Sequence, residues 1–307
     1  MNSTQNEAPV IAVEHLSRRF ESKQALDDVT LELPRGVVLG LVGANGAGKT
    51  TLIKHILGLL RARQGSVRVF GMDPVKQSVA VLGRLGYLSE DRDLPPWMTV
   101  QQLIGYCRAF RPSWDDAYAE SLRRQFQLSP ASVVRTLSKG ELAKAGLLVA
   151  LAYRPELLVL DEPSSGLDPV VRKELLEAVV RSVVAEGRTV LLSSHLLEEI
   201  ARVSDRVAMV CKGRIVLNGA LHDILESHRR LVIRLPDKAA KPSLLPGALS
   251  ITGGPAEWTV ITNGEIESLR SALRQARGEV LEESNATLEE IFHSRVANGA
   301  AGAATVN

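Results

Sequence analysis

The sequence has very little cysteine and no strong excess of either charge. Its two cysteines, Cys107 and Cys211, lie far apart and without the spacing of a metal site, which argues against a disulfide or zinc framework and favours a reducing compartment. The 37 basic and 35 acidic residues leave a net charge of +2. Because a nucleic-acid backbone requires a marked basic excess, we expect no nucleic-acid partner.

Long apolar runs are also absent. The longest run, residues 147–153, is far shorter than the roughly 20 residues that a transmembrane helix needs. Residues 1–10 are polar and carry Glu7, whereas a secretory signal has a basic start followed by an apolar stretch. We therefore expect a cytoplasmic chain that reaches a membrane only through a partner.

The chain has enough apolar residues for a substantial core. With 307 residues, of which 45% are apolar, it can form one large α/β domain and a smaller one. Over residues 11–69, short β-rich runs surround one helical pattern, and helical periodicity over about residues 99–153 indicates a helical insert. From Leu157 onward strands and helices alternate, as is typical of a parallel, doubly wound sheet. We assign residues 1–227 to this domain.

The pattern changes after Ser227. The following segments favour three strands and a helix, namely residues 231–235, 248–252, 258–262 and 265–277. We assign residues 228–296 to a small α+β accessory domain, joined to the first through the proline-containing stretch 236–246. The Ala- and Gly-rich tail, residues 297–307, is expected to be disordered. No motif in the accessory domain indicates chemistry, so a regulatory contact, support of a dimer and passive packing all remain open.

Residues 43–50 form a phosphate-binding motif. They read Gly-Ala-Asn-Gly-Ala-Gly-Lys-Thr and match the pattern G-x-x-x-x-G-K-[ST] between an apolar strand and a helix. The glycines let backbone N–H groups point inward, and the following helix turns its positive end towards the anion. Lys49 is expected to reach the β- and γ-phosphates, and the Thr50 hydroxyl to bind Mg²⁺. The predicted nucleotide-binding residues here are Gly43, Ala44, Asn45, Gly46, Ala47, Gly48, Lys49, Thr50 and Thr51.

Two carboxylates end a second buried strand. Four apolar residues, 157–160, are followed by Asp161 and Glu162, and the carboxyl end of a strand is where an open parallel sheet places ligands. Asp161 is expected to hold Mg²⁺, directly or through water. Glu162 keeps a free acceptor and is the better candidate for polarising an attacking water. Together the two motifs predict binding and hydrolysis of Mg-ATP.

Three further segments complete a family pattern. They are Leu137-Ser138-Lys139-Gly140-Glu141 before a helix, Ser164-Ser165-Gly166-Leu167-Asp168-Pro169 after the acidic pair, and Ser193-Ser194-His195 at the end of a strand. In this order the chain resembles the nucleotide-binding subunits of ABC transporters over about residues 10–225, and most closely those of ABC-2 type exporters. No Asn-Lys-x-Asp run is present to recognise guanine, which argues against a guanine-nucleotide protein.

The resemblance implies a fold and a dimer. The fold would be a P-loop NTPase core with a mostly parallel sheet, an antiparallel β subdomain and a helical insert. Two chains would clamp two ATP molecules head to tail, with Ser138 and Gly140 closing over the partner's nucleotide and Asp168 crossing the interface. His195 would sense the γ-phosphate and hold the attacking water beside Glu162. For Ser138 the alternative is an ordinary helix cap. Asp168 can act as a turn cap before Pro169 and cross the interface as well.

Three positions leave alternatives open. Phe20 occupies the place where the family stacks an aromatic ring on adenine, but a core phenylalanine would give the same pattern. Glu90 stands where the family usually has a glutamine that contacts Mg²⁺ and water, and the added negative charge leaves its protonation or hydration open. Trp97 lies in an exposed-looking segment that suits a membrane partner, or it packs under the helical insert.

The function that follows is ATP-driven movement of a separate integral membrane permease, most simply an exporter of a drug, antibiotic or envelope component. A second ATPase subunit, most simply a copy of the same chain, would complete the machine at the inner face of the membrane. The alternative is a soluble or membrane-associated ABC ATPase with a regulatory or signalling role. The transported substrate and its direction are not encoded here, because the permease contains the path.

Overall fold

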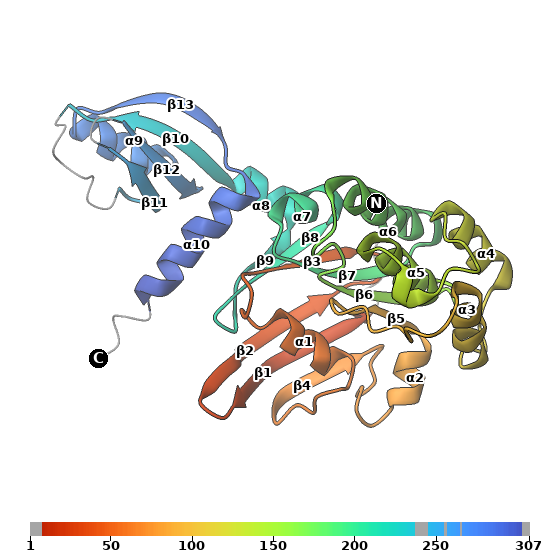
Figure 1. Cartoon of the computed structure of the whole chain (residues 1–307). Coiled ribbons are helices and arrows are strands. Elements are labelled where there is room, and N and C mark those ends of the chain that lie inside the picture. Colours follow the sequence, from red (N-terminus) through yellow and green to blue (C-terminus); the bar gives the residue numbers. More distant parts are fainter. Residues whose placement is uncertain (1–7, 237–244, 255–256, 265, 303–307) are drawn as a thin grey trace, which may run out of the picture.

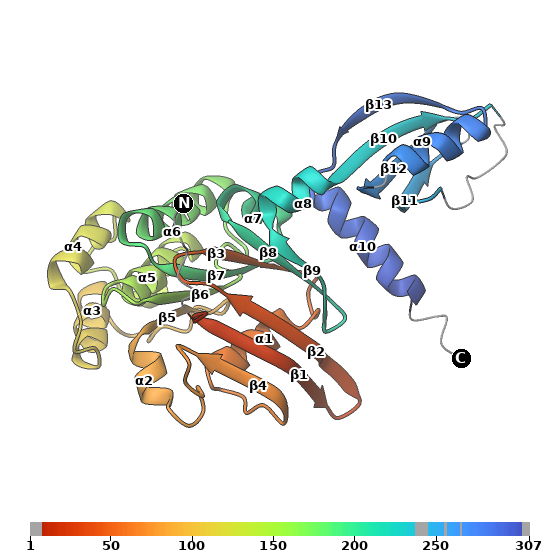
Figure 2. The same ribbon diagram turned by 180° about the vertical axis from the view of Figure 1, so that it is seen from behind.

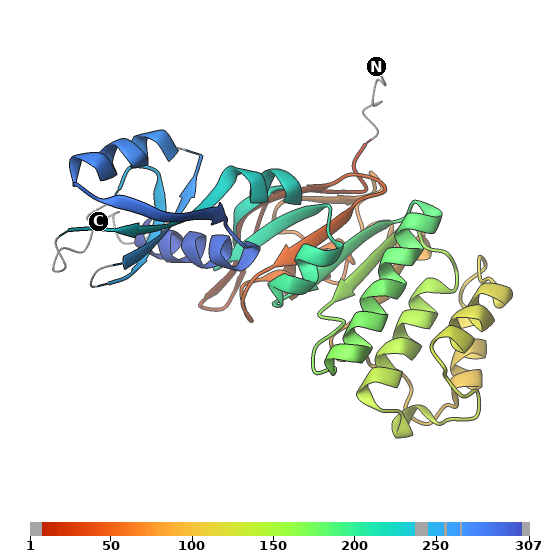
Figure 3. The same cartoon turned by 90° about the horizontal axis from the view of Figure 1, so that it is seen from above.

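The protein consists of a larger α/β body and a smaller α+β body (Figure 1). The computed structural model describes residues 8–236, 245–254, 257–264 and 266–302. Within these ranges, no helix has the length and apolar character needed to cross a membrane. Seen from above, the helical insert lies at one end of the molecule and the smaller body at the other (Figure 3).

A six-stranded sheet forms the centre of the larger body. Its order is β5 (Leu85–Leu88), β6 (Leu157–Asp161), β7 (Thr189–Ser194), β3 (Val38–Val42), β8 (Arg206–Cys211) and β9 (Arg214–Ala220). All neighbouring pairs are parallel except β8 with β9. Every residue of β3, β6 and β7 is buried, as expected for parallel strands covered on both faces. The predicted α/β class with a mostly parallel sheet is confirmed.

An antiparallel sheet packs beside the central one. It has the order β2 (Lys23–Leu33), β1 (Ile11–Phe20) and β4 (Gln64–Val69). Figure 2 shows it next to α1 (Lys49–Ile56). Alternate side chains of β1 and β2 form a core with α1 and one face of the six-stranded sheet. This is the antiparallel β subdomain that the family resemblance implies.

Helices cover the rest of the larger body. The helical insert contains α3 (Val100–Ala109), α4 (Asp116–Gln125), a 3-10 turn η1 (Val134–Thr136) and α5 (Lys139–Leu151), and the short α2 (Ser78–Gly83) precedes it. Thr99 begins α3 with a reciprocal capping box to Gln102. The second core lies between these helices, α6 (Pro169–Glu186), α7 (Leu197–Val203) and the other face of the sheet. The predicted helical insert is therefore confirmed.

The smaller body begins directly after α8 (Leu221–Ser227). Its antiparallel sheet has the order β11 (Ala248–Gly253), β12 (Glu257–Asn263), β10 (His228–Arg234) and β13 (Glu279–Asn285). Apolar side chains of β10 and β12 pack against α9 (Ile266–Gln275). The final helix, α10 (Leu288–Gly302), returns to the larger body, where Leu288 and Ile291 join its core and the helix packs against α7.

Two expectations about this part of the chain differ from the structure. The stretch 236–246 does not join the two bodies, because β10 before it is already paired with β12 and β13. Residues 237–244 of that stretch lie outside the described residues. The tail expected from residue 297 begins inside α10, which continues to Gly302 because alanine favours helices most strongly. Residues 303–307 are likewise outside the description.

Candidate active site

The phosphate-binding motif is a tight loop between β3 and α1, as predicted. Gly46 and Gly48 have φ values of 78° and 118°, a region that favours glycine. A Cβ on Gly43 would lie 2.4 Å from the Val210 carbonyl oxygen, and one on Gly48 would lie 2.6 Å from that of Ala25. The loop can therefore keep this path only with glycine at these positions.

The start of α1 faces a cavity of about 440 Å³. Gly48 precedes the helix, and no side chain caps its first turn in the described part of the chain. The helix thus presents backbone N–H groups and the positive end of its dipole to this cavity, which suits phosphate oxygens. Most residues of the motif line the cavity together with Phe20, Lys23, Glu90 and Glu162. Nucleotide binding at this place is therefore supported by the shape of the backbone as well as by residue type.

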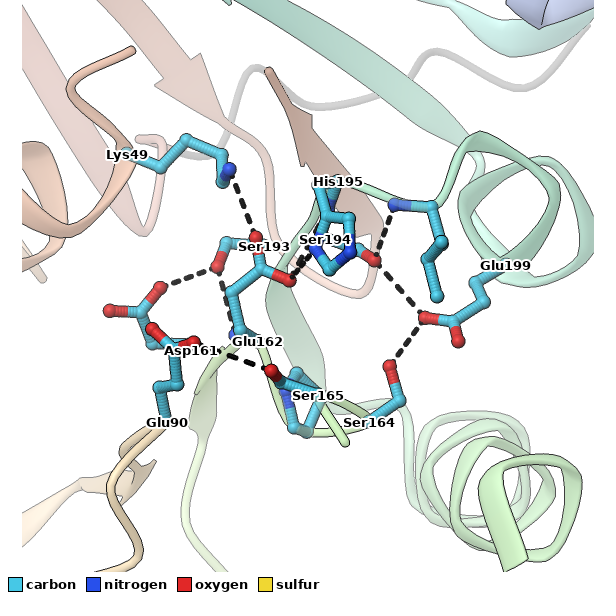
Figure 4. A network of polar contacts seen from close by, with 12 residues as sticks. Lys49, Glu90, Asp161, Glu162, Ser164, Ser165, Ser193, Ser194, His195 and Glu199 are labelled. Carbon is cyan, nitrogen blue, oxygen red and sulfur yellow. Dashed lines mark hydrogen bonds and ion pairs between the residues drawn. The ribbon is translucent and has the colours of Figure 1, made fainter. Parts of the chain in front are cut away.

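Lys49 and Glu162 meet at the inner wall of this cavity (Figure 4). The Lys49 Nζ atom donates to the Gly43 carbonyl oxygen at 2.5 Å and lies 2.9 Å from Glu162 Oε1. The Lys49 ammonium and the Glu162 carboxylate therefore form an ion pair. Both side chains are almost completely buried, which strengthens their attraction. The two groups assigned to the terminal phosphate thus reach the same point.

Glu162 is held in a strained backbone conformation at the end of β6. Its φ is 47°, unusual for a residue with a side chain, and it is only 3% exposed. The backbone N–H donates to Ser193 Oγ at 3.0 Å, which fixes the turn. Its Oε2 lies 2.7 Å from Nδ1 of His195 and accepts the His195 backbone N–H at 3.3 Å. The predicted pair of Glu162 and His195 is therefore brought together.

The residues predicted to hold Mg²⁺ have different surroundings. Asp161 is buried and accepts from Ser193 Oγ at 2.5 Å, whereas Thr50 and Glu90 line the cavity. Glu90 accepts from Ser165 Oγ at 3.3 Å. No cluster of three or more His, Cys, Asp or Glu side chains suited to a metal occurs in the described ranges. The Thr50 hydroxyl and the carboxylates of Asp161 and Glu90 are oxygen ligands of the kind that Mg²⁺ prefers, and Mg²⁺ commonly completes its shell with waters and substrate phosphates.

A tyrosine lies close enough to Asp161, the carboxylate predicted to hold Mg²⁺, to be influenced by its charge. Burial raises the pKa of Tyr87 to about 12, with smaller contributions from the negative charges of Asp161 and Asp91. The phenol therefore stays protonated in the physiological range.

The ring of Phe20 belongs to the cavity rather than to the core. It is 40% exposed, and the Arg18 guanidinium lies 4.6 Å from its centre. The alternative of a core phenylalanine is wrong, because the ring points to the cavity side of β1. An exposed aromatic face next to the phosphate-binding loop is suited to stack on a base, and this contact stays a prediction.

Ser138, Gly140 and Asp168 lie outside the wall of this cavity. Ser138 and Glu141 form a reciprocal capping box at the start of α5, in which hydrogen bonds from Ser138 lower the pKa of the Glu141 carboxyl. Gly140 lets this helix approach α6, since a Cβ there would lie 2.8 Å from a Val171 methyl group. Asp168 accepts the backbone N–H groups of Val170 and Val171 and caps α6. All three residues thus have a local structural role.

The structure adds residues that the sequence did not indicate. Arg92 is buried with a φ of 52° and donates to the carbonyl oxygens of Pro163 and Ser165 at 2.9 and 2.7 Å. Burial lowers its pKa, against a smaller contribution from Glu90. It ties the loop that carries Glu90 to the loop after Glu162. Sequence reasoning also gave no role to Glu199, which lies four residues after His195 and accepts hydrogen bonds from Ser164 and Ser194.

Comparison with known proteins gives the same family as the sequence motifs. The sequence model of the ABC transporter family matches residues 26–165. The daunorubicin/doxorubicin resistance ATP-binding protein DrrA of Streptomyces peucetius is 32% identical over 80% of this chain and 78% of its own length. The Nod factor export ATP-binding protein I of Burkholderia lata is 31% identical, over 91% of this chain and 94% of its length. A solved ATP-binding subunit of an ABC transporter is 31% identical with a TM-score of 0.65, covering 71% and 92% of the two chains.

The chain belongs to the ABC transporter family. Within that family it is an ATP-binding subunit and an ATPase.

Proposed function

We propose that this chain is the ATPase subunit of an exporter, and that two copies hydrolyse ATP at a shared interface to drive a separate membrane permease. The observation that carries the proposal is the chain of contacts from Lys49 and Glu162, which line the cavity, to His195 behind Glu162. It combines a cation for the γ-phosphate, a carboxylate for water and an imidazole that holds the carboxylate. The relatives named for drug resistance and Nod factor export support export.

The proposed chemistry uses each of these groups at a stated atom. A water beside Glu162 attacks the γ-phosphorus while the bond to the β,γ-bridging oxygen breaks, and ADP and phosphate result. Glu162 orients the water and takes its proton, and His195 fixes the carboxylate through Nδ1. Lys49 stabilises negative charge on the phosphate oxygens. When bound, Mg²⁺ neutralises phosphate charge, and Thr50 and Asp161, with Glu90, are the residues that would hold it.

The proposal of a second copy is supported by predicted nucleotide-binding residues that do not line the cavity of their own chain. Ser138 caps the start of α5 and Asp168 caps the start of α6, but neither lines the nucleotide cavity of its own chain. In a head-to-tail pair these helix ends would close on the partner's nucleotide. Dimer closure with ATP and opening after hydrolysis would then supply the movement.

The permease is proposed to dock on an apolar groove of the larger body. Leu59, Tyr106 and Phe110 are large, exposed apolar residues that line it, beside α3 and the end of α1. Trp97 is 71% exposed, so the alternative that it packs under the helical insert is wrong. Such surfaces mark protein contacts. Docking there would hold the chain on the inner face of the membrane.

The test is the Glu162→Gln variant. Loss of the proton acceptor is expected to reduce turnover by about 100-fold or more, while ATP binding is kept and the dimer accumulates. Turnover and size-exclusion chromatography with light scattering in ATP and Mg²⁺ measure both effects. Glu198→Gln, which changes an exposed glutamate, is the control. Retained turnover would exclude Glu162 as the catalytic carboxylate, and a purely monomeric variant in ATP would contradict the shared interface.

A further inference from the structure

A second buried carboxylate lies close to the catalytic pair. Glu199 on α7 is only 5% exposed, yet it does not line the nucleotide cavity. A buried charge is costly unless it is paired and hydrogen-bonded. The partners of Glu199 therefore indicate what it does.

One oxygen of Glu199 joins the two catalytic segments (Figure 4). Its Oε2 accepts from Ser164 Oγ at 2.6 Å and from Ser194 Oγ at 3.1 Å. Ser164 lies two residues after Glu162, and Ser194 directly precedes His195. Ser194 Oγ also accepts the Leu196 backbone N–H at 3.0 Å, so this hydroxyl holds the chain on both sides of His195. A single carboxylate oxygen thus fixes one segment relative to the other.

The other oxygen of Glu199 connects them to the start of α6. Oε1 lies 3.0 Å from Nε of Arg172, an ion pair whose angle is not that of a hydrogen bond. The same guanidinium donates to the Leu167 carbonyl oxygen at 3.2 Å. Leu167 directly precedes Asp168, the residue proposed above to face the partner subunit. Glu199 and Arg172 therefore join the catalytic pair to the segment that would face the partner.

We propose that Glu199 is a positioning residue for ATP hydrolysis. Its carboxylate sets the relative position of the segments carrying Glu162, His195 and Asp168. The proposal rests on the catalytic assignment of Glu162 and His195 made above. The contact between those two is a short one, 2.7 Å, and catalysis is sensitive to displacements of such groups. Glu199 touches no residue assigned to the nucleotide, so it should affect turnover and leave ATP affinity unchanged.

The first test compares Glu199→Gln with Glu198→Gln in the full chain. Glutamine keeps the size of the side chain but removes the charge that faces Arg172 and both hydroxyls. We expect kcat to fall about 10- to 100-fold, with KM and Kd for ATP within about twofold, at a temperature well below the unfolding midpoint of each variant. Glu198, its exposed neighbour on α7, should give wild-type values. A wild-type kcat for Glu199→Gln would overturn the proposal.

The second test distinguishes positioning from stability and does not depend on Glu199→Gln folding. Ser164→Ala removes one hydroxyl donor, whereas Ser164→Thr keeps it. The alanine variant is expected to lose kcat at unchanged ATP affinity, and the threonine variant to recover it. Equal kcat in the two variants would overturn the proposal, as would a loss of kcat and ATP binding in the same proportion as the folded fraction.

The same experiments separate this inference from the proposed catalytic assignment. If Glu162→Gln loses turnover while Glu199→Gln and Ser164→Ala do not, Glu162 keeps its role and Glu199 loses the one inferred here. If Glu162→Gln retains turnover, the catalytic assignment itself fails, and the positioning role fails with it.

Discussion

At the scale of single residues, the site is defined by a few side chains that reach one point from different strands. Lys49 comes from the start of α1, directly after the loop that follows β3, Glu162 from the end of β6 and His195 from the end of β7. Because neighbouring parallel strands end at the same edge, three segments far apart in sequence deliver their polar groups together. Glycines complete the arrangement, since a side chain at Gly43 or Gly48 would collide with backbone oxygens.

Lys49→Ala should weaken ATP binding itself. The variant removes a buried ammonium, and hydrogen bonds to charged groups contribute about 1.5–3 kcal/mol, which corresponds to a loss of roughly 10- to 100-fold in affinity. Isothermal titration calorimetry measures the change. Lys54→Ala, at an exposed position of the same helix, is the control. Unchanged ATP affinity for Lys49→Ala would refute the assignment of this residue.

The local motifs of the site could be predicted because each is continuous in sequence. Residues 43–50 and the pair Asp161 and Glu162 carry their own strand and turn context, so pattern and chemistry agree. Arg92, Arg172 and Glu199 could not be found in this way. Each acts on a segment that lies far along the chain or on another element, and a lone arginine or glutamate in a helix or loop predicts only a solvated surface. Their partners become visible only when the strands are assembled.

At the scale of elements, the smaller body also contains features that the sequence pattern alone did not predict. Strands β10, β11 and β12 and helix α9 have clear apolar alternation and were predicted. Strand β13 was not, because its sequence Glu-Val-Leu-Glu-Glu-Ser-Asn is mostly polar and pairs at the edge of the sheet. The stretch 236–246 was read as a link because proline usually marks a boundary, but a connection between two strands of one sheet contains it as readily.

The apolar groove allows a prediction about membrane recruitment. Phe110→Asp places a charge in a surface that must lose water on docking, so the fraction of the chain recovered with membranes should fall at least about tenfold. ATP affinity should not change, because Phe110 is remote from the nucleotide cavity. Val79→Asp is the control, since Val79 is 87% exposed but does not line the groove. Equal recovery of both variants from co-sedimentation with vesicles containing the permease would exclude the groove as the docking surface.

At the scale of the whole molecule, the junction between the two bodies contains a buried histidine. His228 begins β10 and is almost inaccessible to solvent. Its Nδ1 lies 2.7 Å from the Ile224 carbonyl oxygen on α8, and its Nε2 lies 3.2 Å from a guanidinium nitrogen of Arg295 on α10. An Nε2 that accepts from a cation requires a neutral ring. One side chain thus holds three elements of both bodies together.

Stability should therefore depend on pH through His228. Burial lowers its pKa in the folded state; the hydrogen bond to Ile224 opposes this, and the charge of Arg295 adds to the lowering. Because the unfolded chain then binds the proton more readily, the stabilising contribution is complete above the ordinary value of about 6.5 and is lost as pH falls below it.

Denaturant unfolding of the wild type and His228→Gln between pH 8 and pH 5 measures this dependence. The free energy of unfolding of the wild type should fall more steeply towards acid than that of the variant. His222→Gln replaces an exposed histidine of α8 and should behave as the wild type. Parallel pH profiles for the wild type and His228→Gln would contradict the prediction.

The route of the last helix has a mechanical consequence. The chain leaves the larger body at α8 and comes back along α10, which packs against α7. The accessory sheet is thus connected to the larger body at both ends. A displacement of that sheet would move α10 and, because the two helices pack together, α7 as well. Helix α7 carries Glu199 and begins two residues after His195.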